Sequence, residues 1–167
     1  AGGVMGAYNG WERANWFAQQ GDDVSEEASH TWERHGPWAP RIKEEVENVR
    51  DNCGVLDLPG FSRFNLSGTG SSQYLLGLIT GGLPKIGRMN LAYFADTRGR
   101  ILTEMSVIRH EHDRFTLITA ASAQWHDFDV LNTALPETLT LTDNTNDIST
   151  LIVTGPKSRD ILIKMVT

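Results

Sequence analysis

Apolar residues recur at helical spacing in the first clearly periodic part of the chain. Ile42, Val46, Val49 and Cys53 lie three or four residues apart, which is typical of one face of an amphipathic helix. Pro40 is well suited to the first turn of such a helix. The pattern predicts a helix from Pro40 to about Cys53, with Cys53 as a small buried hydrophobe at its end.

Beyond this helix, apolar and polar residues alternate in short runs that predict strands. The predicted strands are Val55–Leu58, Phe61–Ser67, Met89–Ala95, Arg100–Arg109, Arg114–Ala120, Thr138–Asp143 and Thr150–Thr154. Three more helices are predicted, namely Ser71–Thr80, Ala123–Thr133 and one that begins at Pro156. Short turns join the strands and imply antiparallel pairing. The fold class is therefore α+β, an antiparallel meander flanked by helices, and not a doubly wound parallel sheet.

The first 39 residues differ from the rest of the chain. Glycines alternate there with four of the five tryptophans, without helical or strand periodicity. Tryptophans bury a large area and require a surface to pack on. Residues 1–39 are therefore interpreted as a lead segment or interdomain arm that packs either on its own domain or on an upstream domain. Residues 40–167 are interpreted as the folded domain.

Composition narrows the classes of partner. The formal net charge of −6 argues against a nucleic-acid partner, which favours a basic face. No apolar run approaches the roughly 20 residues of a membrane helix, so no membrane span is predicted. The single cysteine cannot form an internal disulfide and indicates a reducing compartment such as the cytoplasm.

Glu104 is the most informative residue of the predicted meander. Strand side chains alternate between two faces, so Glu104 shares its face with Leu102, Ser106 and Ile108. A carboxylate among such neighbours is costly unless water or a partner solvates it. Two interpretations remain open: an acid on a solvated sheet surface, or an acid that faces a ligand groove.

Other polar clusters give weaker signals. The run from His110 to Asp113 lacks the ligand spacing of known zinc sites, so it is interpreted as a solvated hairpin tip and no metal is predicted. Gly68-Thr69-Gly70 is not followed by Lys-Ser or Lys-Thr, so the P-loop pattern fails, and this chain is not expected to bind FAD or NAD by itself. Five arginines between positions 88 and 114 either end solvated strands or contact a carboxylated ligand tail.

Six short stretches occur in an order and spacing that resemble one family. They are Trp11–Phe17, Val49–Asp57, Phe61–Phe64, Gly87-Arg88, Gly99–Glu104 and Gly155–Arg159. Together they resemble the aminomethyltransferase (glycine-cleavage T-protein) family, in the form of the folate-binding domain of dimethylglycine and sarcosine dehydrogenases. The resemblance covers only about the first half of such a domain, so residues 40–167 would be its N-terminal part, which is not expected to be active alone.

The resemblance implies a function for the whole protein. An upstream FAD-dependent domain would oxidise an N-methylated amine, and tetrahydrofolate would take up the carbon as 5,10-methylenetetrahydrofolate, in the cytoplasm or the mitochondrial matrix. Residues 1–39 would then pack on that flavin domain. Three alternatives stay open: a non-catalytic folate-binding module related to iron–sulfur-assembly proteins, a sulfonium-compound demethylase, and an α+β scaffold without a small ligand.

The resemblance also assigns residues. Glu104 falls where the family has a carboxylate, usually Asp, near the reactive N5/N10 edge of the pterin, and it is the predicted catalytic residue. Many members carry Tyr at the position of Asn90, so Tyr93 is a candidate for the missing stacking contact. The predicted folate contacts are Glu104, Asn90, Tyr93, Thr119, Ala120 and Arg88.

Overall fold

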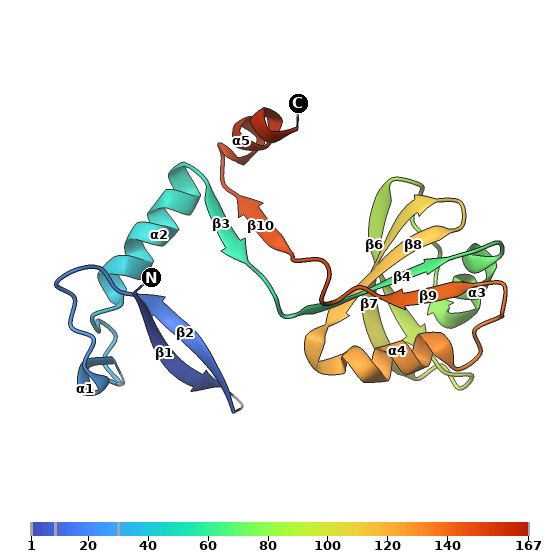
Figure 1. The fold of residues 1–167 in the computed structure, drawn as a ribbon, viewed down its shortest axis with the longest axis horizontal. Helices are drawn as coiled ribbons and strands as arrows, with labels where there is room; N and C mark the ends of the chain where they lie inside the picture. Colours follow the sequence, from blue (N-terminus) through green and yellow to red (C-terminus); the bar gives the residue numbers. More distant parts are fainter. Residues whose placement is uncertain (1, 9, 30, 167) are drawn as a thin grey trace. The chain divides into compact units, whose positions relative to one another are not determined.

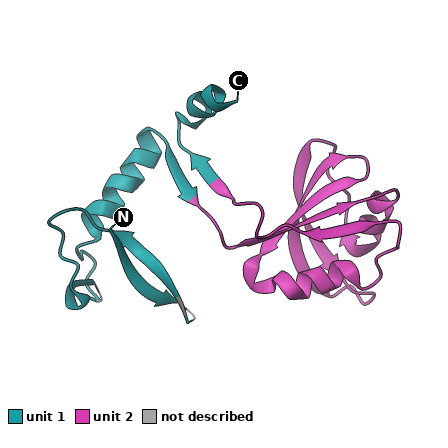
Figure 2. Ribbon diagram, viewed as in Figure 1, with its two compact units in different colours: residues 1–56, 152–167 teal, residues 57–151 magenta. Residues whose placement is uncertain are grey.

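The computed structural model describes residues 2–166 except positions 9 and 30, and the chain divides into two compact units. Unit 1 comprises residues 1–56 and 152–167, and unit 2 comprises residues 57–151 (Figure 2). Among the described residues, no helix is both long enough and apolar enough to cross a membrane.

Unit 1 contains a hairpin, helices and a pair of short strands (Figure 1). Its elements are β1 (Gly3–Tyr8), β2 (Trp11–Phe17), α1 (Glu26–Ser29), α2 (Ala39–Asp51), β3 (Gly54–Asp57), β10 (Leu151–Thr154) and α5 (Ser158–Met165). β1 and β2 are antiparallel, and β3 pairs with β10 where the two units divide. The Trp/Gly-rich segment therefore contains a hairpin that its sequence did not indicate, while the domain boundary at residue 39 stays a prediction.

The predicted amphipathic helix is confirmed as α2. The described residues cover the apolar stripe of α2 only in part, since Ile42 is 42% exposed and Val46 is 40% exposed. Cys53 is half-buried, not buried as predicted. Near the start of α2, Arg41 forms an ion pair with Asp22 at 2.7 Å. The hydrogen bonds from this guanidinium, with a further one from the backbone of Gln19, lower the pKa of Asp22 to about 2.

Unit 2 is built on one six-stranded sheet with the order β5-β6-β7-β8-β4-β9. Its elements are β4 (Phe61–Ser67), α3 (Ser71–Leu78), β5 (Ile79–Thr80), β6 (Arg88–Ala95), β7 (Ile101–Glu111), β8 (Arg114–Ala120), η1 (Ala121–Ala123), α4 (Gln124–Asn132) and β9 (Thr140–Asp143). Each described strand pair in this sheet is antiparallel. The predicted α+β class and the β6–β7–β8 meander are confirmed.

The core of unit 2 lies between one face of this sheet and the two helices α3 and α4. The fully buried apolar side chains are Phe64, Leu66, Leu75, Phe94, Val107, Phe115, Leu117 and Leu131, with Met105 only 1% exposed. Leu75 belongs to α3 and Leu131 to α4, while the sheet supplies the others. Phe128 of α4 meets Phe64 edge-on with ring centroids 5.6 Å apart. Burying each such side chain contributes about 1.5–3 kcal/mol, so this interface holds both helices on the sheet.

Two local features of the meander differ from the prediction. Ile79 and Thr80 leave the predicted helix and pair with β6 as β5, because Ile79 can then join the buried cluster. The register between β6 and β7 shifts after Phe94, whose partner is Thr103, while Ala95 pairs with Ile101. Leu102 is therefore the extra residue of a β-bulge, and a bulge changes the direction of its side chain.

Gly68 occupies a position that other residues cannot take without strain. Its φ is +118°, and a Cβ there would lie 2.4 Å from the carbonyl oxygen of Thr138. We expect Gly68→Ala to lower the free energy of unfolding by about 1–3 kcal/mol. Gly77, in the last turn of α3, has no atom within 4 Å of such a Cβ, so Gly77→Ala is expected to raise it by roughly 0.5–1 kcal/mol. Urea unfolding measures both, and equal shifts for the two variants would contradict this account.

Candidate functional site

Strand alternation divides the meander residues between two faces of the sheet. On the face that α3 and α4 cover, Met105 and Val107 are buried. The opposite face, called here the open face, includes Met89, Leu91, Tyr93, Glu104, Ser106, Ile108, Ile118 and Ala120, which register places on the same side of β6, β7 and β8. Its apolar part is formed by Met89, Leu91, Ile108 and Ile118 and is partly exposed, and such patches mark sites of interaction when they are contiguous.

Glu104 is the single carboxylate of the open face. It lies directly opposite Tyr93 in the β6–β7 ladder, and side chains in that relation approach closely. Glu104 is exposed, and Tyr93 is 41% exposed. Leu91 and Met89, one and two steps further along β6, are 54% and 58% exposed. An aromatic ring, a carboxylate and an apolar surface therefore occur side by side.

The structure separates the six predicted folate contacts into two groups. Glu104, Tyr93 and Ala120 have the register of the open face. Thr119, Asn90 and Arg88 have the register of the other face, since Asn90 lies opposite the buried Val107 and Arg88 lies opposite Arg109. Thr119 is buried and donates a hydrogen bond to Asp127 of α4. One ligand on the open face can reach the first group directly, and the roles of all six residues stay predictions.

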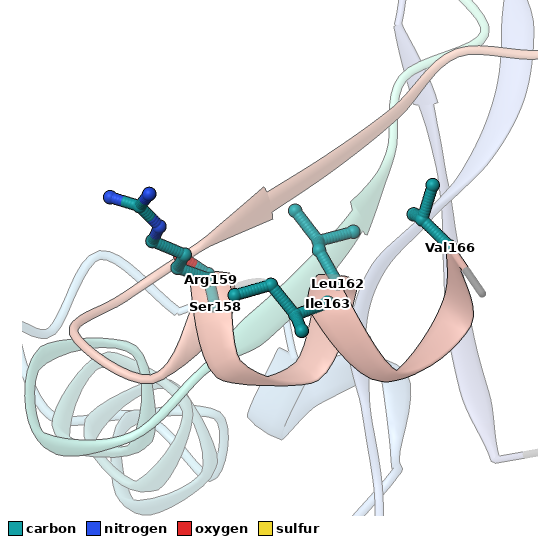
Figure 3. Close-up of a pocket in the computed structure, with 5 residues that line it drawn as sticks. All are labelled: Ser158, Arg159, Leu162, Ile163 and Val166. Atoms are coloured by element: carbon teal, nitrogen blue, oxygen red, sulfur yellow. The ribbon is translucent and has the colours of Figure 1, made fainter.

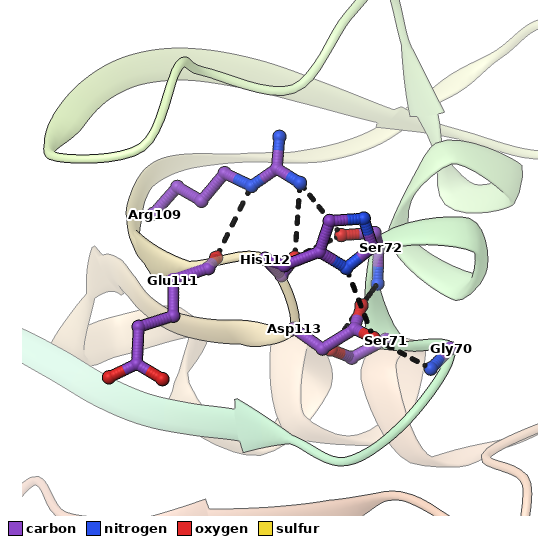
Figure 4. Close-up of polar contacts among 7 residues, drawn as sticks. All are labelled: Gly70, Ser71, Ser72, Arg109, Glu111, His112 and Asp113. Carbon is purple, nitrogen blue, oxygen red and sulfur yellow. Dashed lines mark hydrogen bonds and ion pairs between the residues drawn. The ribbon is translucent and has the colours of Figure 1, made fainter.

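The hairpin tip between β7 and β8 holds the start of α3 (Figure 4). The carboxylate of Asp113 accepts hydrogen bonds from the backbone N–H groups of Ser72 at 2.9 Å and Gly70 at 3.1 Å. These two bonds, the Ser72 bond foremost, hold the pKa of Asp113 well below its usual range. Asp113 thus caps α3 from another element, which satisfies N–H groups that a helix start leaves free.

The tip is solvated only in part, which corrects the sequence prediction. The side chains of Glu111 and His112 are 67% and 79% exposed, but that of Asp113 is only 24% exposed. Arg109 is bound to this tip through the carbonyl oxygen of His112 at 3.0 Å and the hydroxyl of Ser72 at 3.1 Å. Its guanidinium also lies 5.6 Å from the ring centre of Phe115. Among the described residues, no group of three or more His, Cys, Asp or Glu side chains could hold a metal ion.

Two polar groups of unit 2 were missed by sequence reasoning. Arg63 is only 4% exposed, and its guanidinium donates to the hydroxyl of Thr150 at 2.8 Å and the carbonyl oxygen of Phe61 at 3.0 Å. Asp127 is fully buried and accepts hydrogen bonds from Thr119 and from His126 Nδ1, the latter at 2.8 Å. The sequence did not indicate these two groups, because Thr150 lies 87 residues from Arg63 and Thr119 meets Asp127 only when α4 packs on the sheet.

A pocket of about 340 Å³ on α5 is a weaker candidate for a site (Figure 3). It is lined by Ser158, Arg159, Leu162, Ile163 and Val166. All five belong to one helix and the residue after it, so the pocket has no opposing wall within its lining. Leu162 and Ile163 are 41% and 59% exposed. The open face offers more varied chemistry, because it combines a carboxylate with an aromatic ring.

Comparison with known proteins agrees with this architecture. The GCVT N-terminal domain family matches residues 1–167. The chain belongs to this family. The aminomethyltransferase T of the glycine cleavage system from Bartonella henselae has the same fold, with a TM-score of 0.71 and 20% identity over 98% of this chain and 40% of that one.

Curated relatives include larger proteins. The chain is 30% identical over 166 residues to the mitochondrial dimethylglycine dehydrogenase of Rattus norvegicus, which covers 98% of the chain and 19% of that protein. It is 27% identical to the sarcosine oxidase subunit alpha of Corynebacterium sp. (strain P-1), over 94% of the chain and 16% of that protein. It is 30% identical to the aminomethyltransferase of Chlorobaculum tepidum, over 74% of the chain and 35% of that protein. The chain therefore spans about a fifth of the length of the dehydrogenase.

The Asp113 cap predicts how this GCVT N-terminal domain responds to acid. The pKa of Asp113 is lower in the folded chain than its ordinary value of 3.8, so its ionised form contributes stability above that value, and the contribution is lost as the pH falls below it. We expect Asp113→Asn to lower the melting temperature near pH 7. Between about pH 5 and pH 2.5, the melting temperature of this variant should fall less steeply than that of the wild type.

Thermal unfolding at a series of pH values measures this effect. Glu137→Gln is the control, since Glu137 is an exposed carboxylate of the same unit. An equal change of slope in both variants would mean that net charge, and not the helix cap, causes the acid sensitivity.

Proposed function

We propose that the open face is one wall of a tetrahydrofolate site, and that Glu104 acts at the reactive edge of the pterin. The observation that carries this proposal is the pairing of Glu104 with Tyr93 on an exposed apolar face. The pyrimidine ring of a tetrahydropterin is flat, and the bicycle carries N–H donors along its edge. Such a ring fits an apolar wall, an aromatic neighbour and one carboxylate acceptor.

The residues present fit the chemistry of one-carbon transfer. Tetrahydrofolate, when bound, supplies the nitrogen nucleophile for the carbon. A carboxylate at that point can stabilise positive charge on a carbon–nitrogen unit and can accept a proton from the attacking nitrogen. Glu104 is exposed and free to reach a ligand from the middle of β7. The strand holds its backbone rigidly, which helps to orient a reactant.

Family membership supports the same assignment for the whole protein. We infer that it is a folate-dependent enzyme of N-methylglycine metabolism, because relatives over nearly the whole chain include dimethylglycine dehydrogenase and sarcosine oxidase. The N-methylated amine would be oxidised by an FAD-dependent part outside these residues, on which residues 1–39 would pack. We also propose that the protein is cytoplasmic or, like the dimethylglycine dehydrogenase of Rattus norvegicus, mitochondrial.

The division of these residues between the two faces of the sheet also indicates which of them would contact the ligand. The hydroxyl of Thr119 donates a hydrogen bond to Asp127 of α4, so the side chain of Thr119 is assigned a structural role in this proposal. Arg88 and Asn90 have the register of the other face, so the carboxylated tail of folate would meet groups outside the open face. Leu91 and Ile118 are added as apolar contacts of the ring.

Glu104→Gln keeps the size of the side chain and removes its charge. In the full-length protein we expect formation of 5,10-methylenetetrahydrofolate to fall by about 10²–10³-fold, while the dissociation constant of tetrahydrofolate changes much less. Stopped-flow or coupled assays give the first quantity, and a fluorescence titration gives the second. Glu111→Gln, an exposed carboxylate on the same strand, is the control and should leave both unchanged.

The outcome separates the candidate functions. Unchanged transfer in Glu104→Gln would remove Glu104 from the mechanism. Tight folate binding with no methylene transfer in the wild type would favour a non-catalytic folate-binding module. Methyl transfer from a sulfonium compound, with none from N-methylated amines, would favour the demethylase.

Tyr93 tests the aromatic contact separately. We expect Tyr93→Ala to weaken tetrahydrofolate binding by about tenfold, because stacking on an aromatic side chain contributes about 1–3 kcal/mol for nucleic-acid bases. Tyr93→Phe should bind almost as tightly as the wild type, since it keeps the ring. Equal losses in the two variants would show that the hydroxyl, and not the ring, makes the contact.

A further inference from the structure

Unit 2 contains a cavity on the helix-covered side of the sheet, away from Glu104. Its volume is about 360 Å³, which lies in the range of small-molecule sites. α3 contributes Leu78, α4 contributes Val130, and β6 contributes the buried Phe94. Phe94 has the register of the helix-covered face. The cavity and the proposed folate wall are therefore separate surfaces.

The β-bulge between β6 and β7 helps to form this cavity. Leu102, the unpaired residue of the bulge, lines it together with Phe94 and Ala95. Without the bulge, strict alternation would place Leu102 on the same face as Glu104. The bulge thus transfers one apolar side chain from the open face to the cavity wall.

Two polar side chains of α4 also line the cavity. His126 and Asp129 are three residues apart, so they lie on the same side of the helix. His126 Nδ1 donates to Asp127, which is fully buried and is held in turn by Thr119. In the neutral form of the imidazole, this bond places the proton on Nδ1 and leaves Nε2 as a hydrogen-bond acceptor.

Asp129 is the second acceptor. Its carboxylate is exposed, and within the described part of the chain it takes no part in an ion pair. An anion and a neutral acceptor beside an apolar cavity are complementary to a ligand that has an apolar body and a cationic donor group. An anionic ligand would be repelled by Asp129, and a purely apolar ligand would gain no interaction with either acceptor.

We propose that this cavity binds a small amphipathic cation, an alkyl- or arylammonium. The apolar body occupies the space between Leu78, Phe94 and Leu102. The ammonium group pairs with Asp129 and donates a hydrogen bond to His126 Nε2. The buried Asp127 is a positioning residue, because it orients the imidazole without contacting the ligand.

The test uses n-hexylammonium as the probe with the full-length protein, followed by isothermal titration calorimetry and saturation-transfer NMR. n-Hexanol and hexanoate have the same apolar body with a neutral and an anionic head. We expect saturable binding of hexylammonium that is at least tenfold tighter than that of hexanol, and no binding of hexanoate. Equal affinities for hexylammonium and hexanol, or no saturation by hexylammonium, would overturn the proposal.

Variants assign the binding to this cavity. Asp129→Asn keeps the shape of the side chain and is expected to weaken hexylammonium binding at least fivefold. Ala134→Trp fills the cavity wall and should abolish binding, with circular dichroism used to check folding. Glu137→Gln, outside the cavity lining, is the matched charge control and should bind as the wild type does.

The proposed folate site provides an independent comparison. Glu104→Gln should leave hexylammonium binding unchanged, and saturating tetrahydrofolate should not displace the probe. Binding that is lost in Glu104→Gln but retained in Asp129→Asn would place the ammonium on the open face and contradict the cavity assignment. Failure of the folate experiments has no bearing on the cavity, because neither Asp129 nor His126 has a role there.

Discussion

The structure of the larger unit depends on the burial of one face of its six-stranded sheet under α3 and α4. Leu75 and Leu131 lie in the same fully buried cluster as sheet residues such as Phe64 and Phe94. Because strand side chains alternate, burying one set leaves the other set outside. Glu104 is exposed because Thr103, Met105 and their alternating partners turn inward. The candidate site is therefore a consequence of core formation, and a one-residue slip of β7 would bury its carboxylate.

At two places, hydrogen bonds to an aspartate fix the position of a helix on the sheet. Asp113 binds the start of α3 to the β7–β8 turn through backbone N–H groups. Asp127 binds α4 to β8 through Thr119, and at the same time it orients His126. Buried or half-buried carboxylates of this kind are stable only when donors surround them. Apolar burial thus holds each of the two helices on the sheet, and one aspartate fixes the position of each helix.

The two faces of the same sheet offer different chemistry. The open face has one carboxylate beside an aromatic ring and suits a flat ring with edge donors. The helix side has a partly open, mainly apolar pocket with two acceptors at its wall and suits a small cation. The β-bulge at Leu102 contributes to this difference, since it moves an apolar side chain from one face to the other. Family membership bears on the first surface, whereas the second rests on the geometry of this chain.

The hydrophobic pattern by itself determined the helix α2, the meander of β6, β7 and β8, the antiparallel α+β class and the position of Glu104 within its strand. These features are local, because apolar residues recur with a period of two along a strand and of 3.6 along a helix, which consecutive residues show directly. Only the tertiary structure decided that Thr119 and Asn90 have a different face from Glu104, that Asp113 caps a helix some 40 residues away in sequence, and that Leu102 leaves its expected face. Each of these depends on register, on a bulge or on a partner distant in the chain, and none of those has a signature in neighbouring residues.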